Sequence, residues 1–140
     1  PEQTARMMEM MPPAGEIDVA VSIPVITGTQ NRKADSAIEE FLHRADLVAA
    51  RRPDWRIGVG CGDDPVAAMD AAGLAAERFG PDRVFAKPSA GLPVDRDRKR
   101  CYPFGPRAWA ALLSKLPRAL YALGGCCGCG PEWIQAINKE

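Results

Sequence analysis

The chain has 140 residues, enough for one hydrophobic core and few for two, so we expect a single domain over residues 1–140. Lysine plus arginine and aspartate plus glutamate number 18 each, and this balance argues against a protein that binds nucleic acid or a membrane surface. No apolar run approaches the roughly 20 residues of a membrane-spanning helix. The N-terminus lacks the order of a signal peptide, and five cysteines fit no full disulfide framework, so we expect a cytoplasmic protein.

The first predicted elements are a helix, a strand and a second helix. Residues 3–11 carry a methionine-rich face and precede two prolines, which end a helix. The run 17–26 (IDVAVSIPVI) is β-branched and mostly apolar, which is typical of a strand buried on both faces. The next helix should begin at Asp35 or Ser36 and end near Arg51. Its apolar face comprises Ile38, Phe41, Leu42, Ala45 and Val48.

A second strand and helix follow. Residues 55–61 (WRIGVGC) form a short apolar run that ends at a cysteine. Asp63 or Asp64 can cap the next helix, Pro65 suits its first turn, and Gly80 before a proline ends it. Residues at or beside its two ends therefore predict both limits of this helix.

The alternation continues to the end of the chain. Residues 83–87 form a third strand, a long loop covers 88–105, and a helix is predicted over 106–116. The fourth strand is 119–123, and a last helix runs from residue 131 to the chain end. Consecutive βα units predict an α/β fold with a parallel sheet, and no glycine-rich phosphate loop is present.

Three cysteines follow predicted strands. Cys61 ends the second strand, and Cys126 and Cys127 follow the fourth. The carboxyl ends of parallel strands meet at one edge of a sheet, so these thiols should lie together. The surrounding glycines allow the chain to turn so that adjacent sulfurs can converge. Three thiolates on Zn²⁺ would leave a fourth position open, which is typical of catalytic rather than structural zinc.

Other interpretations of the cysteines remain open. Cys61 alone could be a packing residue, and Cys126 and Cys127 could form a strained disulfide. The CCGC run could belong to an iron–sulfur or redox module, although it lacks the usual spacing. Cys129 is the alternative fourth sulfur, and its binding would close the site; Cys101 we interpret as a non-ligand.

Some polar residues receive no catalytic role. His43 is interpreted as a surface or half-buried histidine, and Asp63 and Asp64 as helix caps. Ser22 has no paired base and is not expected to act as a nucleophile.

Four motifs resemble those of the zinc-dependent homocysteine S-methyltransferases, in the same order. They are GGCCGCGPEWIQAI, IGVGC, AKPSAGLP and CYPFGPRAW, and the resemblance runs from about Ile17 to the C-terminus. It implies that Cys61, Cys126 and Cys127 bind zinc, and that the sulfur of a thiol amino acid such as homocysteine completes the tetrahedron. That thiolate would then attack a methyl donor, whose identity the sequence does not give.

The family fold is a (β/α)₈ TIM barrel of about 250 residues. The four βα units here match its C-terminal half, about strands 5–8. The resemblance therefore implies a complementary half-barrel polypeptide, self-association of this chain, or a chain that is one piece of a longer or cleaved protein. A degenerate structural subunit is the alternative to an active half.

The sequence departs from the family pattern at four positions. Gly60 and Ser89 stand where the family has asparagine, Trp133 where it has histidine, and Cys129 where it often has threonine. These departures leave the three ligand cysteines in place and concern substrate contacts. As substrate-binding residues we nominate Ser22, Ser89 and Gly125.

Overall fold

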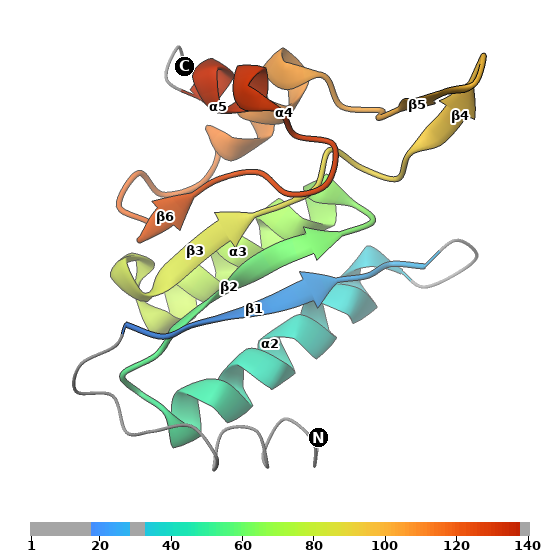
Figure 1. Cartoon of the computed structure of the whole chain (residues 1–140). Coiled ribbons are helices and arrows are strands. Elements are labelled where there is room, and N and C mark those ends of the chain that lie inside the picture. Colours follow the sequence, from blue (N-terminus) through green and yellow to red (C-terminus); the bar gives the residue numbers. More distant parts are fainter. Residues whose placement is uncertain (1–17, 29–32, 138–140) are drawn as a thin grey trace.

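A computed structural model describes residues 18–28 and 33–137. Its central element is a parallel sheet in the order β1-β2-β3-β6 (Figure 1). The strands are β1 (Ala20–Val25), β2 (Arg56–Gly62), β3 (Val84–Lys87) and β6 (Ala122–Leu123). The helices are α2 (Ala34–Arg51), α3 (Pro65–Phe79), α4 (Pro106–Leu113) and α5 (Pro131–Ile137), and a 3₁₀ turn covers Pro81–Arg83. The predicted parallel α/β fold is thus confirmed for this part of the chain.

Several element boundaries follow their local signals. Asp64 caps α3 by accepting hydrogen bonds from the backbone N–H groups of Val66 and Ala67, and Pro65 occupies the first turn. Gly80 ends the helix with a positive φ of 92°. The predicted helix at 3–11 and the final residues 138–140 lie outside the described residues.

The predicted cap of α2 is wrong. The N-cap is Lys33, which makes no capping side-chain bond, and Asp35 lies in the first turn, where a carboxylate still favours the helix dipole. The predicted apolar face is confirmed, because Ile38, Phe41 and others on it are buried in the core.

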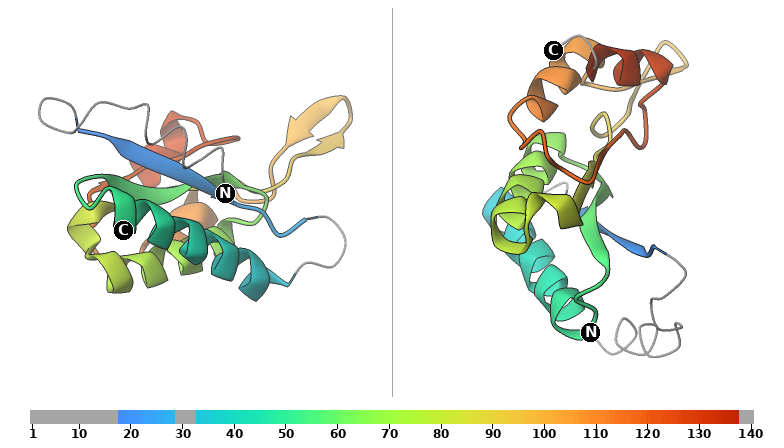
Figure 2. Two further views of the ribbon diagram at one scale, coloured as in Figure 1. Left: turned by 90° about the horizontal axis from the view of Figure 1, so that it is seen from below. Right: turned by 90° about the vertical axis from the view of Figure 1, so that its left-hand side faces the viewer.

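One face of the sheet is packed and the other is bare among the described elements. Helices α2 and α3 cover the same side, as the end-on view of Figure 2 shows. Burial therefore alternates along β1: Ile23 and Val25 are buried, whereas Ser22 and Pro24 are exposed. The expectation that β1 is buried on both faces is wrong, because no described helix covers its second face.

Small residues lie on both faces of the sheet. Helix α3 buries six alanines on the packed side, and β2 contributes Gly58 and Gly60 on the opposite face. At Gly58 a side-chain carbon would lie 2.5 Å from the ring of Phe85, which covers this glycine. The Phe85 ring thus occupies the space that a side chain at residue 58 would fill.

The predicted loop at 88–105 contains a β-hairpin. Strands β4 (Val94–Arg96) and β5 (Lys99–Cys101) pair in antiparallel fashion and project from the body beyond the carboxyl ends of the sheet (Figure 1). Its turn residues Asp97 and Arg98 have φ values of 49° and 62°, the conformation of a type I′ hairpin turn. The expectation of an irregular loop is therefore corrected here.

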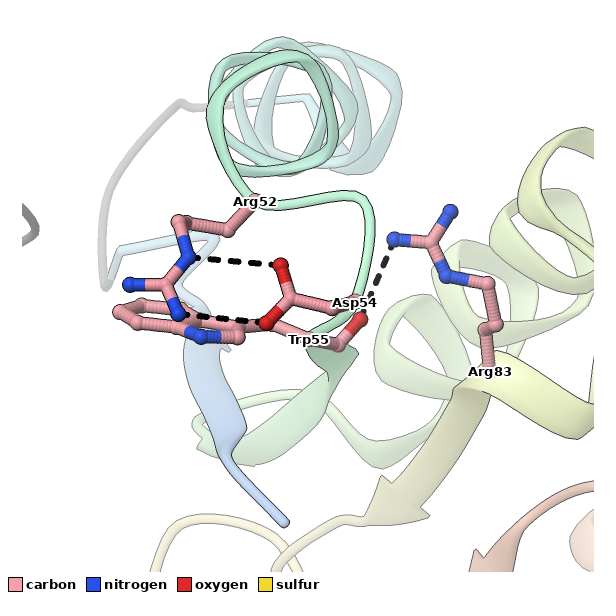
Figure 3. A network of polar contacts seen from close by, with 4 residues as sticks. All are labelled: Arg52, Asp54, Trp55 and Arg83. Atoms are coloured by element: carbon pink, nitrogen blue, oxygen red, sulfur yellow. Dashed lines mark hydrogen bonds and ion pairs between the residues drawn. The ribbon is translucent and has the colours of Figure 1, made fainter. Parts of the chain in front are cut away.

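A polar network fixes the turn between α2 and β2, at the amino ends of the strands (Figure 3). The guanidinium of Arg52 lies 4.2 Å from the ring centroid of Trp55 and donates to Asp54 at 3.3 and 3.2 Å. Trp55 is only 2% exposed, and Arg83 donates to its carbonyl at 3.1 Å. The hydrogen bond from Arg52 holds the pKa of the Asp54 carboxyl below its usual value. This network lies at the end of the sheet opposite to the cysteines, which lie at or beyond the carboxyl ends of the strands.

In the described part of the chain, no helix combines the length and the apolar character that crossing a membrane requires.

Candidate metal centre

Cys61 lies where β2 leaves regular strand geometry. Its φ is 63° and that of Gly62 is 115°, so two consecutive residues have left-handed backbone conformations. A side chain at Gly62 would approach the carbonyl oxygen of Val25 to 2.3 Å, which leaves room only for glycine. A left-handed conformation costs of order 1 kcal/mol or more at a residue such as Cys61, and such conformations concentrate at functional sites. The strand end therefore directs this thiol out of the sheet.

The other two cysteines lie on a tight turn after β6. The N–H of Cys129 donates to the carbonyl of Cys126 at 3.1 Å, and Gly128 has φ 79°, as at the third position of a type II turn. A side chain at Gly128 would lie 2.4 Å from the ring of Tyr102. The glycine thus serves both the turn and the close approach of that ring.

The turns bring three sulfur atoms together. The Sγ atoms of Cys61 and Cys127 are 3.5 Å apart, those of Cys126 and Cys127 are 4.0 Å apart, and all three lie within 4.8 Å of one another. Among the described residues they form the group of cysteine, histidine or acidic side chains that could hold a metal ion. Tetrahedral Zn–S bonds of about 2.3 Å place two sulfurs about 3.8 Å apart, so the donor set and its spacing fit zinc.

The thiols affect one another's ionisation. Partial burial raises the pKa of Cys61, but hydrogen bonding from Cys127 and from the Gly62 N–H outweighs it, and the net pKa lies below the usual value. The same contacts with Cys61 and Cys126 raise the pKa of Cys127 to about 11. Among these two thiols, the contact therefore favours the ionised form at Cys61 and the protonated form at Cys127.

The remaining cysteines lie outside this group. The Sγ of Cys129 lies 3.8 Å from the carbonyl oxygen of Pro88, and burial raises the pKa of its thiol. The Sγ of Cys101 lies 3.8 Å from the carbonyl oxygen of Lys99 in the hairpin. The structure brings neither into the three-sulfur group. His43 is exposed on α2, in agreement with its interpretation as a surface residue.

The three nominated substrate residues occupy different surroundings. Ser22 is exposed on the bare face of the sheet, and its hydroxyl fills the space where a side chain at Gly60 would project. Gly125 borders Cys129, whose Cβ would lie 2.5 Å from a side-chain carbon at residue 125. Ser89 is buried, and its hydroxyl is hydrogen-bonded within the chain.

Sequence reasoning missed the role of Asp63. Its carboxylate does not cap α3; it accepts hydrogen bonds from the backbone N–H groups of Thr27 and Gly28, both at 2.7 Å, and from the Thr27 hydroxyl at 3.1 Å. Burial raises the pKa of Asp63, and these bonds lower it further than burial raises it. The residue after the Cys61 turn thus ties the end of β2 to the end of β1. No local signal marks this contact, because its partners lie 36 and 35 positions away.

The fold and the site define an α/β protein with a cluster of three cysteine thiols at the carboxyl ends of its parallel strands. The model of the homocysteine S-methyltransferase family matches residues 3–140. The chain belongs to this family of methyltransferases, whose members act on a thiol substrate and a methyl donor. No curated protein matches the chain.

Proposed function

We propose that this chain carries the thiol-activating centre of a zinc-dependent, homocysteine-type S-methyltransferase, with Cys61, Cys126 and Cys127 as the zinc ligands. The observation that carries the proposal is the convergence of three sulfurs within 4.8 Å in a member of this family. When bound, zinc would supply a Lewis acid that lowers the pKa of an acceptor thiol at its open fourth position.

The chain's own residues give this centre its charge. With zinc bound, the three cysteines would be thiolates and would place three negative charges around the site, so an acceptor sulfur there would stay electron-rich and suited to attack a methyl group. The exposed side of the cluster, at Cys127, is the side from which a substrate thiol would approach. Ser22 and Gly125 are proposed as substrate contacts from the bare face and from the cysteine turn. Catalysis would then consist of thiol activation and positioning, with no general base among these residues.

The rival interpretations require different sulfur arrangements. A closed structural site or an iron–sulfur centre needs a fourth protein ligand, and the obvious candidate, Cys129, points to the carbonyl of Pro88. Three sulfurs with one exposed side favour an open site. A subunit that keeps the metal for stability alone would share this geometry and would differ only in activity.

We further propose that residues 1–140 form one unit that corresponds to the C-terminal half of a (β/α)₈ barrel. Four parallel strands are half the number of such a barrel, and the bare face of β1 would form part of its interior. The outer edge of β1 and that of β6 have no strand neighbours among the described residues. Unpaired edges and a bare face favour association, so a complementary half-barrel or a second copy is the proposed partner.

Metal analysis of the purified chain tests the centre directly. We expect one zinc per chain in the wild type and its loss in Cys126→Ala, while Cys101→Ala, which removes a thiol outside the cluster, keeps the metal. Stoichiometric zinc in Cys126→Ala would sink the ligand assignment.

Activity and colour separate the remaining candidates. The anaerobically purified chain should show no visible absorption, because zinc thiolates are colourless and iron–sulfur centres are not. Methyl transfer to homocysteine should appear when the complementary half is supplied. A zinc-loaded assembly that transferred methyl groups to no thiol would instead identify a structural subunit.

A further inference from the structure

The segment Pro88–Ala90 lies between the two parts of the chain that carry the clustered thiols. It follows β3, the strand between β2 and β6. The Pro88 carbonyl accepts a hydrogen bond from the Cys126 N–H at 2.9 Å, and the Ala90 N–H donates to the Cys127 carbonyl at 2.8 Å. Its backbone is therefore bonded to both cysteines of the turn after β6.

The side chain of Ser89 makes the connection to the third cysteine. Its hydroxyl donates to the carbonyl of Gly62 at 2.7 Å and accepts from the N–H of Gly91 at 3.1 Å. Gly62 directly follows Cys61. One three-residue segment thus makes hydrogen bonds to Cys126, to Cys127 and to Gly62, the residue after Cys61.

Ser89 is held rigidly. It is 2% exposed, and its carbonyl accepts a hydrogen bond at 3.0 Å from the indole of Trp109, which is fully buried. Both the donor and an acceptor site of the hydroxyl are used inside the protein. This leaves the group poorly placed for a substrate and well placed to fix the backbone around it.

The backbone that Ser89 contacts lies beside the left-handed conformation of Cys61. The bond from Ser89 ends on Gly62, whose φ is 115°, next to Cys61 with φ 63°. A buried hydrogen bond contributes about 1 kcal/mol, a magnitude comparable to the cost of a left-handed residue. The hydroxyl can therefore offset the strain that directs the Cys61 thiol toward Cys127.

We propose that Ser89 is a positioning residue of the three-thiolate centre: its hydroxyl fixes the Cys61–Gly62 turn against the Cys126–Cys127 turn. This inference rests on the proposed function for the identity of the metal, but the juxtaposition of the thiols stands without it. Partners of metal ligands typically change metal affinity by 10–100-fold when removed. Ser89→Ala should therefore bind zinc 10–100-fold more weakly than wild type.

The test has one arm with metal and one without. Zinc affinity of the full chain is measured by competition with a chromogenic chelator, for wild type, Ser89→Ala and the control Ser114→Ala. Ser114 donates to the Ala111 carbonyl at 2.9 Å at the exposed end of α4, so the control deletes the same group away from the cysteines. In the second arm, the metal-free chains carry Cys126→Ser, and dibromobimane cross-links thiols that lie close together. The peptide that joins Cys61 to Cys127 is quantified by mass spectrometry.

We expect Ser89→Ala to lose zinc affinity and to give several-fold less of this cross-link, whereas Ser114→Ala matches wild type in both arms. A folded Ser89→Ala chain with wild-type affinity and cross-linking would overturn the inference. Should Ser89→Ala not fold, Trp109→Phe removes the indole donor to the Ser89 carbonyl together with part of a buried ring. A folded Trp109→Phe chain with unchanged affinity and cross-linking would equally overturn the inference. A wild-type chain without zinc affinity would refute the proposed function, and the cross-linking arm would still decide the role of Ser89.

Discussion

The hydroxyl of Tyr121 donates a hydrogen bond of 2.8 Å to the carboxylate of Asp18, although the two residues lie 103 positions apart. Asp18 precedes β1 at one edge of the sheet, and Tyr121 precedes β6 at the other. Arg56, from the strand between, lies 4.3 Å from the Tyr121 ring centroid and 3.4 Å from the Asp18 carboxylate. Three side chains thus join the amino ends of the two edge strands across the strand between them.

Removal of the Tyr121 hydroxyl tests how much this contact stabilises the sheet. The group is half exposed, so Tyr121→Phe should lower the free energy of unfolding by only about 0.5–1 kcal/mol, because the ring still stacks under Arg56. Tyr121→Ala removes the stacking as well and should cost more. Urea denaturation of both variants measures the difference, and equal losses would assign the whole effect to the hydroxyl and none to the ring.

A side chain at residue 60 should be better tolerated when Ser22 is replaced by a smaller residue. An added Cβ would lie 1.7 Å from the Ser22 hydroxyl and 3.1 Å from its Cβ. Gly60→Ala should therefore destabilise the chain, and Ser22→Ala should recover part of the loss. A double-mutant cycle in urea should give a coupling free energy of about 1 kcal/mol. Strict additivity would contradict the proposed close approach of these residues.

Asp64 and Asp63 should respond differently to substitution. Asp64→Ala removes the cap of α3 and should cost about 1 kcal/mol at neutral pH. The loss should be measured by chemical denaturation, with Asp70→Ala in the exposed face of the same helix as the control. A cost no larger than that of the control would show that the capping bonds contribute nothing.

Asp63 should make the stability of the chain depend on pH. Its pKa is lowered below the ordinary 3.8 in the folded state, so its stabilising contribution is present above 3.8 and is lost as the pH falls through the lower folded value. Asp63→Asn should cost about 1–2 kcal/mol at pH 7, because a charged acceptor of the Thr27 and Gly28 N–H groups is lost. The penalty should shrink in acid. The free energies of unfolding of the two chains are compared at pH 7 and pH 3. A penalty that did not change with pH would show that the contact does not depend on the charge of Asp63.

Cys129 should prove to be a packing residue. Cys129→Ala should keep a full complement of metal and lose about 1 kcal/mol of stability, because the substitution leaves a small cavity beside the core. Zinc content and thermal denaturation are measured on the same preparation. Loss of the metal together with retained fold would instead make Cys129 a ligand.

The parts of the fold that local chemistry determines could be predicted. The cap at Asp64, the proline after it and the glycine at residue 80 all lie within or beside α3, so its limits were predicted correctly. The bare face of β1 could not be predicted, because an apolar run such as IDVAVSIPVI does not reveal what covers it. The hairpin at 94–101 was missed because its turn, Asp97-Arg98, is neither an Asn-Gly nor an Asp-Gly pair, the two sequences that usually mark such turns.

The candidate site likewise has features that the sequence predicts and features that depend on long-range contacts. The grouping of Cys61 with Cys126 and Cys127 follows from a general property of parallel strands, so sequence order was sufficient to predict it. The direction of Cys129 depends on the type II turn at Gly128, which the sequence alone did not specify. The contacts of Ser89 and Asp63 join residues 27 and 36 positions apart, and only the folded chain brings them together.

The projecting hairpin has a consequence for how the chain responds to proteolysis. Its tip presents Arg96, Arg98, Lys99 and Arg100 to solvent, and exposed loop tips are preferred sites of tryptic cleavage. A single cut there would place Cys61 on one fragment and Cys126 with Cys127 on the other. A metal ion bound by all three thiolates would then link two separate polypeptides, and a chelator would remove that link without breaking a covalent bond.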